Sequence, residues 1–351
     1  EGVDITLREQ PLDAPASSIM IRPGSMVFRG FSYASGVTAM AASTSQHPSE
    51  LYTFVQGRIE RETTSNPWLS RIRLARQEAF NYKADDGLGI TSVLIYPLDY
   101  EKGKRYPLIV DIHGGPESCY HNGWVSSYGN WGQVAAARGY FVFMPNYRAS
   151  TGRGVAFAKE GLGDLAGKEF TDVLDGIDEL VDMGLVDSKR VGIGGGSYGG
   201  YFSAWAATKH SKRFAASCVF VGVSNQISKR NTTDIPYEDY YVHWGMWTYE
   251  DFEKVWDRSP VKWAKGSTTP TLILHGKEDP RVHPSQSLEL YRSLKVHGKA
   301  PVRLVWYPGE GHGNRRNPAR LDFIMRTMDW FDHYLQDGSS GMPPAELSYP
   351  D

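Results

Sequence analysis

The stretch Arg190-Val-Gly-Ile-Gly-Gly-Gly-Ser-Tyr-Gly-Gly200 decides the fold of this chain. Its first four residues, Arg190–Ile193, are predicted to form a β-strand that runs directly into a glycine-rich turn around Ser197. The turn has the pattern G-x-S-x-G, in which glycines two positions before and after the serine relieve crowding at a strained strand-to-helix turn. Because Tyr201–Lys209 is predicted to be a helix, the strand–turn–helix context that this pattern requires is present.

Strand candidates alternate with helical segments on both sides of this turn. Apolar runs predict strands at Ser92–Tyr96, Pro107–Ile112, Tyr140–Met144, Arg190–Ile193, Phe214–Val221, Thr271–Leu274 and Val302–Trp306. Apolar residues at helical steps of three and four predict amphipathic helices around Val173–Val181 and Leu321–Leu335. This alternation predicts an α/β fold with a mostly parallel sheet and helices on both faces. In such a sheet, the active site lies at the carboxyl ends of the strands.

Three loops that follow predicted strands carry residues suited to catalysis. The turn His113-Gly-Gly-Pro116 can aim backbone N–H groups at a reacting carbonyl oxygen, beside the N–H of Tyr198. Asp279 lies in the loop after Thr271–Leu274, with Glu278 as the neighbouring competitor. His312 lies between two glycines after Val302–Trp306.

Taken singly, each of these features has an ordinary reading as a glycine-rich turn, an exposed loop carboxylate or a surface histidine. Their order along the chain, Ser197 then Asp279 then His312, is the order Ser…Asp/Glu…His of α/β hydrolases. We therefore predict Ser197 as nucleophile, His312 as general base and Asp279 as the acid that orients it. This chemistry needs no cofactor and no metal.

The first 75 residues differ from the rest in their predicted secondary structure. Val37–Ser43, Glu50–Val55 and Arg58–Arg61 are predicted strands of a β-meander, with a tight turn at Gln56-Gly57. So few strands do not form a stable sheet alone. We expect a β segment over 1–75, a catalytic domain over 76–337 and an irregular tail over 338–351.

Composition narrows the classes of partner. The net charge is −2 and no long run of one sign occurs, which argues against nucleic-acid and membrane-surface binding. The chain has two cysteines, Cys119 and Cys218, and unpaired thiols are favoured over a disulfide. Cys218 lies in the predicted strand Phe214–Val221, where a thiol packs as a small hydrophobe.

The motifs resemble those of the prolyl oligopeptidase family of serine peptidases, and most of all its acylaminoacyl-peptidase branch. The resemblance covers about residues 35 to 337 and is carried by His113-Gly-Gly-Pro116, Pro145-Asn-Tyr-Arg-Ala-Ser-Thr-Gly152, Gly196-Ser-Tyr-Gly-Gly200, His275-Gly-Lys-Glu-Asp279 and Tyr307-Pro-Gly-Glu-Gly-His312. It implies an α/β-hydrolase fold preceded by a short propeller segment. It also implies hydrolysis of short peptides through an acyl-enzyme, in the manner of acylaminoacyl- or dipeptidyl-peptidases.

The resemblance also assigns further residues. Prolyl oligopeptidase proper and the dipeptidyl-peptidase-IV-like enzymes carry a tyrosine where this sequence has His113, so the backbone N–H of Gly115 is implied as the oxyanion donor beside Tyr198. The specificity pocket is implied near Val223 and Val282. The aromatic residues of a proline pocket are not evident in Ser224-Asn-Gln-Ile-Ser228, so strict proline specificity is not expected.

Several alternatives stay open at this point. A carboxylesterase would use the same triad on small esters, and a non-catalytic module could keep the fold. Family members carry a β-propeller before the hydrolase domain, and residues 1–75 match only its last strands. We expect the missing propeller portion, as a separate chain, or a second copy as partner. A cytoplasmic location is expected, with periplasmic or secreted locations open because the true N-terminus is expected upstream.

Overall fold

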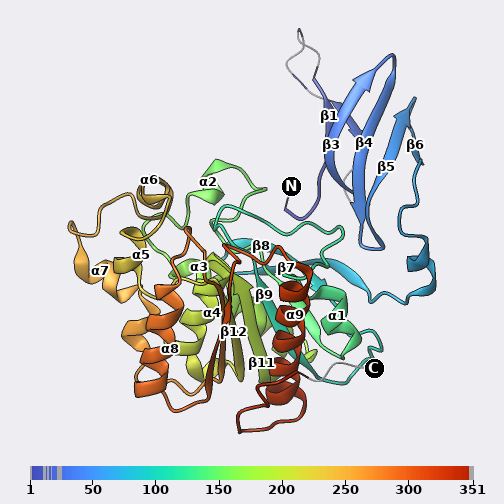
Figure 1. Cartoon of the computed structure of the whole chain (residues 1–351). Coiled ribbons are helices and arrows are strands. Elements are labelled where there is room, and N and C mark those ends of the chain that lie inside the picture. Colours follow the sequence, from blue (N-terminus) through green and yellow to red (C-terminus); the bar gives the residue numbers. More distant parts are fainter. Residues whose placement is uncertain (1, 11–12, 14–15, 17, 22–25, 348–351) are drawn as a thin grey trace.

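The computed structural model describes residues 2–10, 13, 16, 18–21 and 26–347, which form three sheets (Figure 1). The first sheet pairs β1 (Leu7–Glu9) with β2 (Ser18–Ile21). The second is an antiparallel sheet in the order β3-β4-β5-β6, with bounds Val27–Ala34, Val37–Thr44, His47–Val55 and Arg58–Arg61. The third sheet has eight strands and forms the centre of the catalytic domain.

The large sheet has the order β14-β13-β12-β11-β9-β10-β8-β7. Its strands are β7 (Gln77–Lys83), β8 (Gly89–Ile95), β9 (Tyr106–Ile112), β10 (Phe141–Met144), β11 (Val186–Gly196), β12 (Ala216–Phe220), β13 (Thr271–Gly276) and β14 (Val302–Tyr307). Strands β9 to β14 are parallel, whereas β8 pairs antiparallel with both β10 and β7. The predicted α/β-hydrolase fold class is confirmed.

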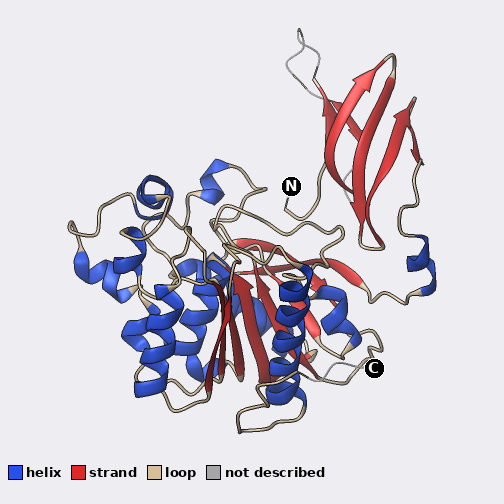
Figure 2. Ribbon diagram, in the orientation of Figure 1, coloured by secondary structure: helices blue, strands red, loops and turns tan. Residues whose placement is uncertain are grey.

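Helices cover both faces of this sheet (Figure 2). On one face, α3 (Lys168–Asp182) and α4 (Tyr198–Thr208) bury Phe170, Ile177 and Phe202 against the strands, and α8 (Ser285–His297) extends this layer. On the other face, α1 (Gly132–Ala137) and α9 (Asn317–Phe331) bury Ala135 and Phe331. Short helices occupy the connections: α2 (Val155–Ala158), α5 (Gln226–Arg230), α6 (Pro236–Glu238) and α7 (Phe252–Asp257).

Tighter and wider helical turns complete the chain. The 3₁₀ segments are Pro67–Arg71, Ser211–Arg213 and Pro260–Trp263, and the π-helical segments are Asp239–Trp244 and Asp332–Gln336. From Gly338 to Leu347 the chain forms neither helix nor strand. Within the described residues, no helix is both long and apolar enough to cross a membrane.

Four strands, β1, β2, β3 and β7, were missing from the sequence prediction, and others were misplaced by a few residues. β7 was missed because its buried Phe80 and Tyr82 alternate with polar residues, and β3 because it is mostly exposed. β11 starts at Val186 and continues through Gly196, because glycines that suggest a turn still pair with neighbouring strands. Helix α4 starts at Tyr198, three residues before the predicted start. Both cysteines are free, and Cys218 is buried in β12 as predicted.

The four-stranded sheet stands beside the catalytic domain (Figure 1). A side chain at Gly123 would come within 2.7 Å of Val27, so the sheet packs closely on that loop. The N-terminal residues also dock on the catalytic domain, since the N–H of Asn122 donates to the carbonyl oxygen of Val3 at 2.9 Å. Phe31 and Tyr33 on β3 are each 66% exposed. The stretch around residue 75 connects Pro67–Arg71 to β7.

Candidate active site

Ser197 sits at the sharp turn between β11 and α4. Its backbone adopts φ 61° and ψ −116°, a strained conformation for a residue with a side chain. A Cβ at Gly195 would come within 2.3 Å of the Ile112 carbonyl oxygen, and one at Gly199 within 2.0 Å of the same atom. The end of β9 therefore excludes any side chain at these two positions. This is the local reason for the G-x-S-x-G pattern.

Asp279 and His312 are joined by a short hydrogen bond. The Nδ1 atom of His312 lies 2.7 Å from Oδ2 of Asp279, which is buried. The other carboxylate oxygen accepts from the backbone N–H groups of Arg281 at 2.9 Å and Val282 at 3.1 Å. Glu278, the competitor in the sequence, is exposed. The geometry thus pairs His312 with Asp279 and not with Glu278.

Charge on Asp279 is favoured by its surroundings. Burial alone raises the pKa of this carboxyl, but hydrogen bonds from His275 and His312 outweigh it and hold the pKa well below its ordinary value. The carboxylate is therefore ionised at neutral pH. An ionised acid fixes the proton of His312 on Nδ1 and leaves Nε2 able to accept one.

The three residues lie in loops that follow strands of the large sheet, at the carboxyl ends of those strands. Ser197 follows β11, Asp279 follows β13 and His312 follows β14, and these parallel strands all end on the same side. His312 is hydrogen-bonded to Asp279. His312 and Ser197 are both among the described residues, and the structure shows no hydrogen bond between them. Such bonds often tighten only when substrate is bound.

The loop that carries His312 is held by hydrogen bonds on its C-terminal side. Glu310 is buried and accepts hydrogen bonds from the backbone N–H groups of Arg315 at 2.7 Å and Arg316 at 3.3 Å. The hydroxyl of Tyr128 accepts from the N–H of Asn314 at 3.1 Å. These bonds fix the backbone on the C-terminal side of His312, so the imidazole starts from a defined position.

A second imidazole, which the sequence analysis did not single out, contacts the same carboxylate. His275 is fully buried at the end of β13, and its Nε2 lies 3.2 Å from Oδ2 of Asp279 and 2.8 Å from the carbonyl oxygen of Val282. Its Nδ1 lies 2.6 Å from the hydroxyl of Ser287 on α8. The fixed spacing His275-x-x-x-Asp279 was the available signal, but a histidine ending a strand has no distinctive pattern.

The glycine-rich turn after β9 packs directly on Ser197. A Cβ at Gly114 would lie 3.3 Å from the Cβ of Ser197, and Gly115 has φ 122°, a conformation that favours glycine. His113 is buried and its ring stacks on Tyr147 with centroids 4.5 Å apart. Burial lowers the pKa of His113 to about 4, so the ring is neutral. Its Nδ1 lies 2.8 Å from the carbonyl oxygen of Gly114, which ties the turn to its own side chain.

Tyr198 is fixed at both ends. Its backbone begins α4, and its hydroxyl donates a short hydrogen bond to the carboxyl group of Glu169. Glu169 is buried, and this burial raises its pKa to about 8. The N–H of Ala166 also donates to Glu169, at 2.6 Å. The contact explains why a bulky tyrosine follows the nucleophile: its ring anchors the turn in the core.

One pocket brings the predicted substrate-binding residues to Ser197. It has a volume of about 150 Å³, and its lining includes Ser197, Tyr198, Gly115, Val223 and Val282. Charged and polar side chains complete the lining: Gln226, Lys229, Glu238, His243 and Arg281. The sequence analysis missed Lys229, Glu238 and His243, which lie on short helices after β12, and Arg281, which follows β13, because none of them belongs to a motif that indicates a pocket.

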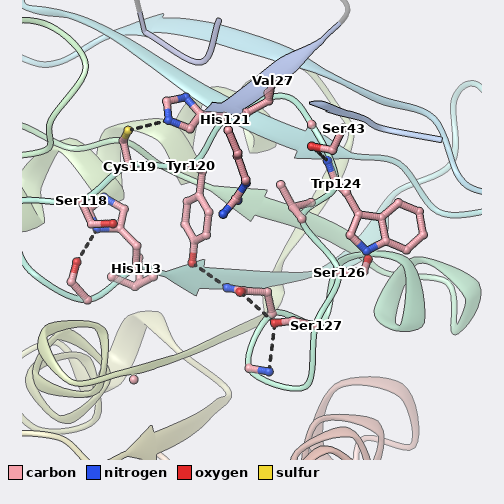
Figure 3. A pocket seen from close by; sticks show the side chains of 18 residues that line it. Val27, Ser43, His113, Ser118, Cys119, Tyr120, His121, Trp124, Ser126 and Ser127 are labelled. Atoms are coloured by element: carbon pink, nitrogen blue, oxygen red, sulfur yellow. Dashed lines mark hydrogen bonds between the residues drawn. The ribbon is translucent and has the colours of Figure 1, made fainter. Parts of the chain in front are cut away.

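A second, larger hollow lies on the other side of the glycine-rich turn (Figure 3). Its volume is about 560 Å³, and Gly114 and Gly196 form part of its wall. Val27 and Ser43 of the small sheet also line it, and Ser43 accepts from the backbone N–H of Trp124 at 3.4 Å. None of the predicted triad residues lines this hollow. Among the described residues, no group of His, Cys, Asp and Glu side chains is arranged to hold a metal ion.

Comparisons with known proteins agree with this architecture. The chain is 36% identical to the uncharacterized peptidase YuxL of Bacillus subtilis, over 82% of this chain and 44% of that protein. It is 28% identical to dipeptidyl-peptidase 5 of Porphyromonas gingivalis, over 90% of this chain and 47% of that protein. It is 29% identical to the acylamino-acid-releasing enzyme of Mus musculus, over 71% of this chain and 34% of that protein. The chain thus spans less than half the length of these relatives.

The acylaminoacyl peptidase of Pyrococcus horikoshii has a similar solved structure. The TM-score is 0.82 at 29% sequence identity, covering 92% of this chain and 52% of that one. The model of the prolyl oligopeptidase family matches residues 127–338, which is more than half of this chain. The chain therefore belongs to the prolyl oligopeptidase family of serine-type peptidases.

Proposed function

We propose that this chain hydrolyses short peptides, as an acylaminoacyl- or dipeptidyl-type peptidase, with Ser197 as its nucleophile. The observation that carries the proposal is the 2.7 Å hydrogen bond from His312 to the buried Asp279. It lies at the carboxyl ends of the strands, where Ser197 occupies its strained turn. In this arrangement a base that is oriented by a third group lies beside a serine, and such an arrangement activates the serine hydroxyl as a nucleophile.

The mechanism follows from this arrangement. His312 donates its Nδ1–H to Asp279, so Nε2 removes the proton of Ser197 as the hydroxyl attacks the substrate carbonyl. The backbone N–H groups of Tyr198 and Gly115 stabilise the oxyanion that forms. His312 then passes the proton to the leaving amine, and an acyl-enzyme remains. Water, with His312 again as base, releases the acyl group.

Peptides are favoured over other acyl substrates by two of the relatives, YuxL of Bacillus subtilis and dipeptidyl-peptidase 5 of Porphyromonas gingivalis, which are named as peptidases. The pocket beside Ser197 is small, at about 150 Å³, and is walled by Val223 and Val282 on one side. That space suits the side chain of the residue whose carbonyl is attacked. The remainder of a peptide would extend away from the pocket.

The test is covalent labelling followed by turnover. A fluorophosphonate is expected to label the wild-type chain and not Ser197→Ala. Short peptide anilides are then expected to be hydrolysed with a higher kcat/KM than anilides that lack a peptide bond on the acyl side. Normal labelling of Ser197→Ala would contradict the nucleophile. Turnover of short-chain esters without any turnover of peptide anilides would instead favour a carboxylesterase.

A further inference from the structure

The larger hollow, beside the glycine-rich turn after β9, carries a positive charge that no acidic side chain balances. Figure 3 shows this hollow, whose volume is about 560 Å³. Of the described residues that line it, none is aspartate or glutamate. Arg29 of β3 lines it and is exposed. Within the described part of the chain, the guanidinium of Arg29 makes no ion pair and no hydrogen bond. An unpaired cation beside a hollow favours an anionic ligand.

The charge of Arg29 acts on the wall of the hollow. His121 lies in this wall, and its pKa is lowered first by burial and then by the charge of Arg29. The imidazole is therefore neutral at neutral pH, and its Nε2 lies 3.5 Å from Sγ of Cys119. His113, the other histidine in the described lining, is neutral as well, because burial lowers its pKa to about 4. Among the described lining residues, the positive charge thus comes from Arg29.

Serine hydroxyls supply further donors to the same hollow. Ser126 and Ser43 both line it. Oγ of Ser126 accepts from the N–H of Gln133 at 3.1 Å, and Oγ of Ser43 accepts from the N–H of Trp124 at 3.4 Å. Neither hydroxyl donates to another described residue, so each keeps its proton for a ligand. A carboxylate accepts several hydrogen bonds at once, and therefore complements a guanidinium with hydroxyls beside it.

The hollow adjoins Ser197. Gly196, the residue before Ser197, forms part of its wall, and so does Gly114. A Cβ at Gly114 would lie 3.3 Å from the Cβ of Ser197. The small pocket of Val223 and Val282, which suits the acyl side of the substrate, shares no described lining residue with the hollow. The two cavities therefore lie on different sides of Ser197.

The hollow also reaches the loop that carries His312. Ser127 and Gly129 line the hollow, and the hydroxyl of Tyr128 between them accepts from the N–H of Asn314 at 3.1 Å. In the proposed mechanism His312 passes its proton to the leaving amine, so the leaving part of a peptide emerges on the side of this loop. The hollow therefore lies where the leaving part of the peptide would extend.

We infer that Arg29, with the hydroxyls of Ser43 and Ser126, binds a carboxylate on the part of the peptide that leaves with the amine. This inference rests on the proposed function, because it assigns the leaving group of the same site. Two sources supply such a carboxylate. One is the free carboxyl terminus of a short leaving peptide, and the other is an aspartate or glutamate side chain within it. Four extended residues span up to about 13 Å, so a leaving peptide of this length is long enough to enter the hollow.

The experiment compares matched substrates with the full chain. The acyl part is acetyl-alanyl-leucyl throughout, and the leaving part is a run of two, three or four glycines, each as the free acid and as the amide. A further pair of leaving parts, glutamyl-glycine amide and glutaminyl-glycine amide, differs only in the side-chain carboxylate. In at least one pair, the substrate with the carboxylate is expected to have about a tenfold higher kcat/KM, which corresponds to about 1.4 kcal/mol. The pair that responds identifies the source.

Variants link this preference to Arg29. In Arg29→Gln the preference is expected to fall to near one. Arg58→Gln, at an exposed arginine of β6 in the same small sheet, should keep it. Fluorophosphonate labelling of the wild type and turnover of acetyl-alanyl-leucyl anilide, whose leaving group has no carboxylate, separate the two proposals, because failure of both would remove the proposed function. Turnover of the anilide with no carboxylate preference in any pair, or with a preference that survives in Arg29→Gln, would overturn this inference.

Discussion

Nε2 of the buried His275 lies 3.2 Å from Oδ2 of Asp279, the same oxygen that lies 2.7 Å from Nδ1 of His312. One carboxylate oxygen therefore contacts two imidazoles with different surroundings. His275 is fixed by Ser287 and by the carbonyl oxygen of Val282, whereas the His312 imidazole is 25% exposed. The buried ring holds the carboxylate in place, and the exposed ring is the one that we propose as the general base.

His275→Asn is expected to lower kcat by about tenfold or more with a smaller change in KM, because small misplacements of catalytic groups are costly. The measurement is steady-state kinetics on a peptide anilide. His283→Asn, an exposed histidine four residues after Asp279, is the matched control and should leave kcat unchanged. An equal loss in both variants, or no loss in His275→Asn, would argue against a positioning role.

Ser197→Ala is expected to reduce turnover by about three orders of magnitude or more and to abolish fluorophosphonate labelling. His312→Ala should reduce turnover to a similar extent. Thermal unfolding should show folded protein in both cases, since neither change leaves a cavity in the core. Ser70→Ala, at an exposed serine far from the site in sequence, is the control. Activity close to wild type in Ser197→Ala would show that another residue is the nucleophile.

Much of the fold could be predicted from the sequence, because parallel buried strands leave long apolar runs. Val110, Ile193 and Leu274 lie in such runs, and the strands around them were found. β7 could not be found in this way, because at the sheet edge only one of its faces is buried. β3 was missed for a related reason: all of its residues beyond Phe28 are exposed.

The candidate site divides along similar lines. Ser197, Asp279 and His312 each lie in a short motif after a strand, so they could be predicted from their neighbours in the sequence. His243 and Glu238, on the long segment after β12, meet Gly115 and Ser197 at the pocket only through the folding of that segment over the site. No local spacing encodes that meeting. The contact between Tyr198 and Glu169 is likewise formed between distant segments.

Activity is expected to rise with pH across the neutral range. Asp279, whose pKa is held low by His275 and His312 against the effect of burial, stays ionised throughout this range. A histidine that acts as general base must be neutral to accept the proton of the serine, and histidine side chains as a class change charge between about pH 5 and 8. The measurement is kcat/KM of a peptide anilide against pH. A flat profile over that range would be inconsistent with a histidine base.

Glu169 is expected to make stability fall with increasing pH. Burial raises its pKa to about 8, above the ordinary value of 4.5, so the folded state keeps a proton that the unfolded state releases. Its contribution is therefore fully present below pH 4.5 and is lost as pH rises through about 8. Glu169→Gln should remove this part of the pH dependence. Thermal melts of both proteins at several pH values measure it, and parallel curves would show that Glu169 does not titrate abnormally.

The small sheet is expected to bind another surface through β3. Phe31 and Tyr33 are each 66% exposed, and both β3 and β6 are edge strands of the small sheet. Exposed apolar side chains on an unpaired edge favour association with further strands, either a propeller portion supplied as a separate chain or a second copy. The purified chain should therefore show a concentration-dependent mass in solution. Replacing Phe31 and Tyr33 by serine should shift it toward the monomer, while Ser70→Ala should not. A wild-type chain that remains monomeric up to about 100 μM, and does not bind an added propeller portion, would show that this surface needs no partner.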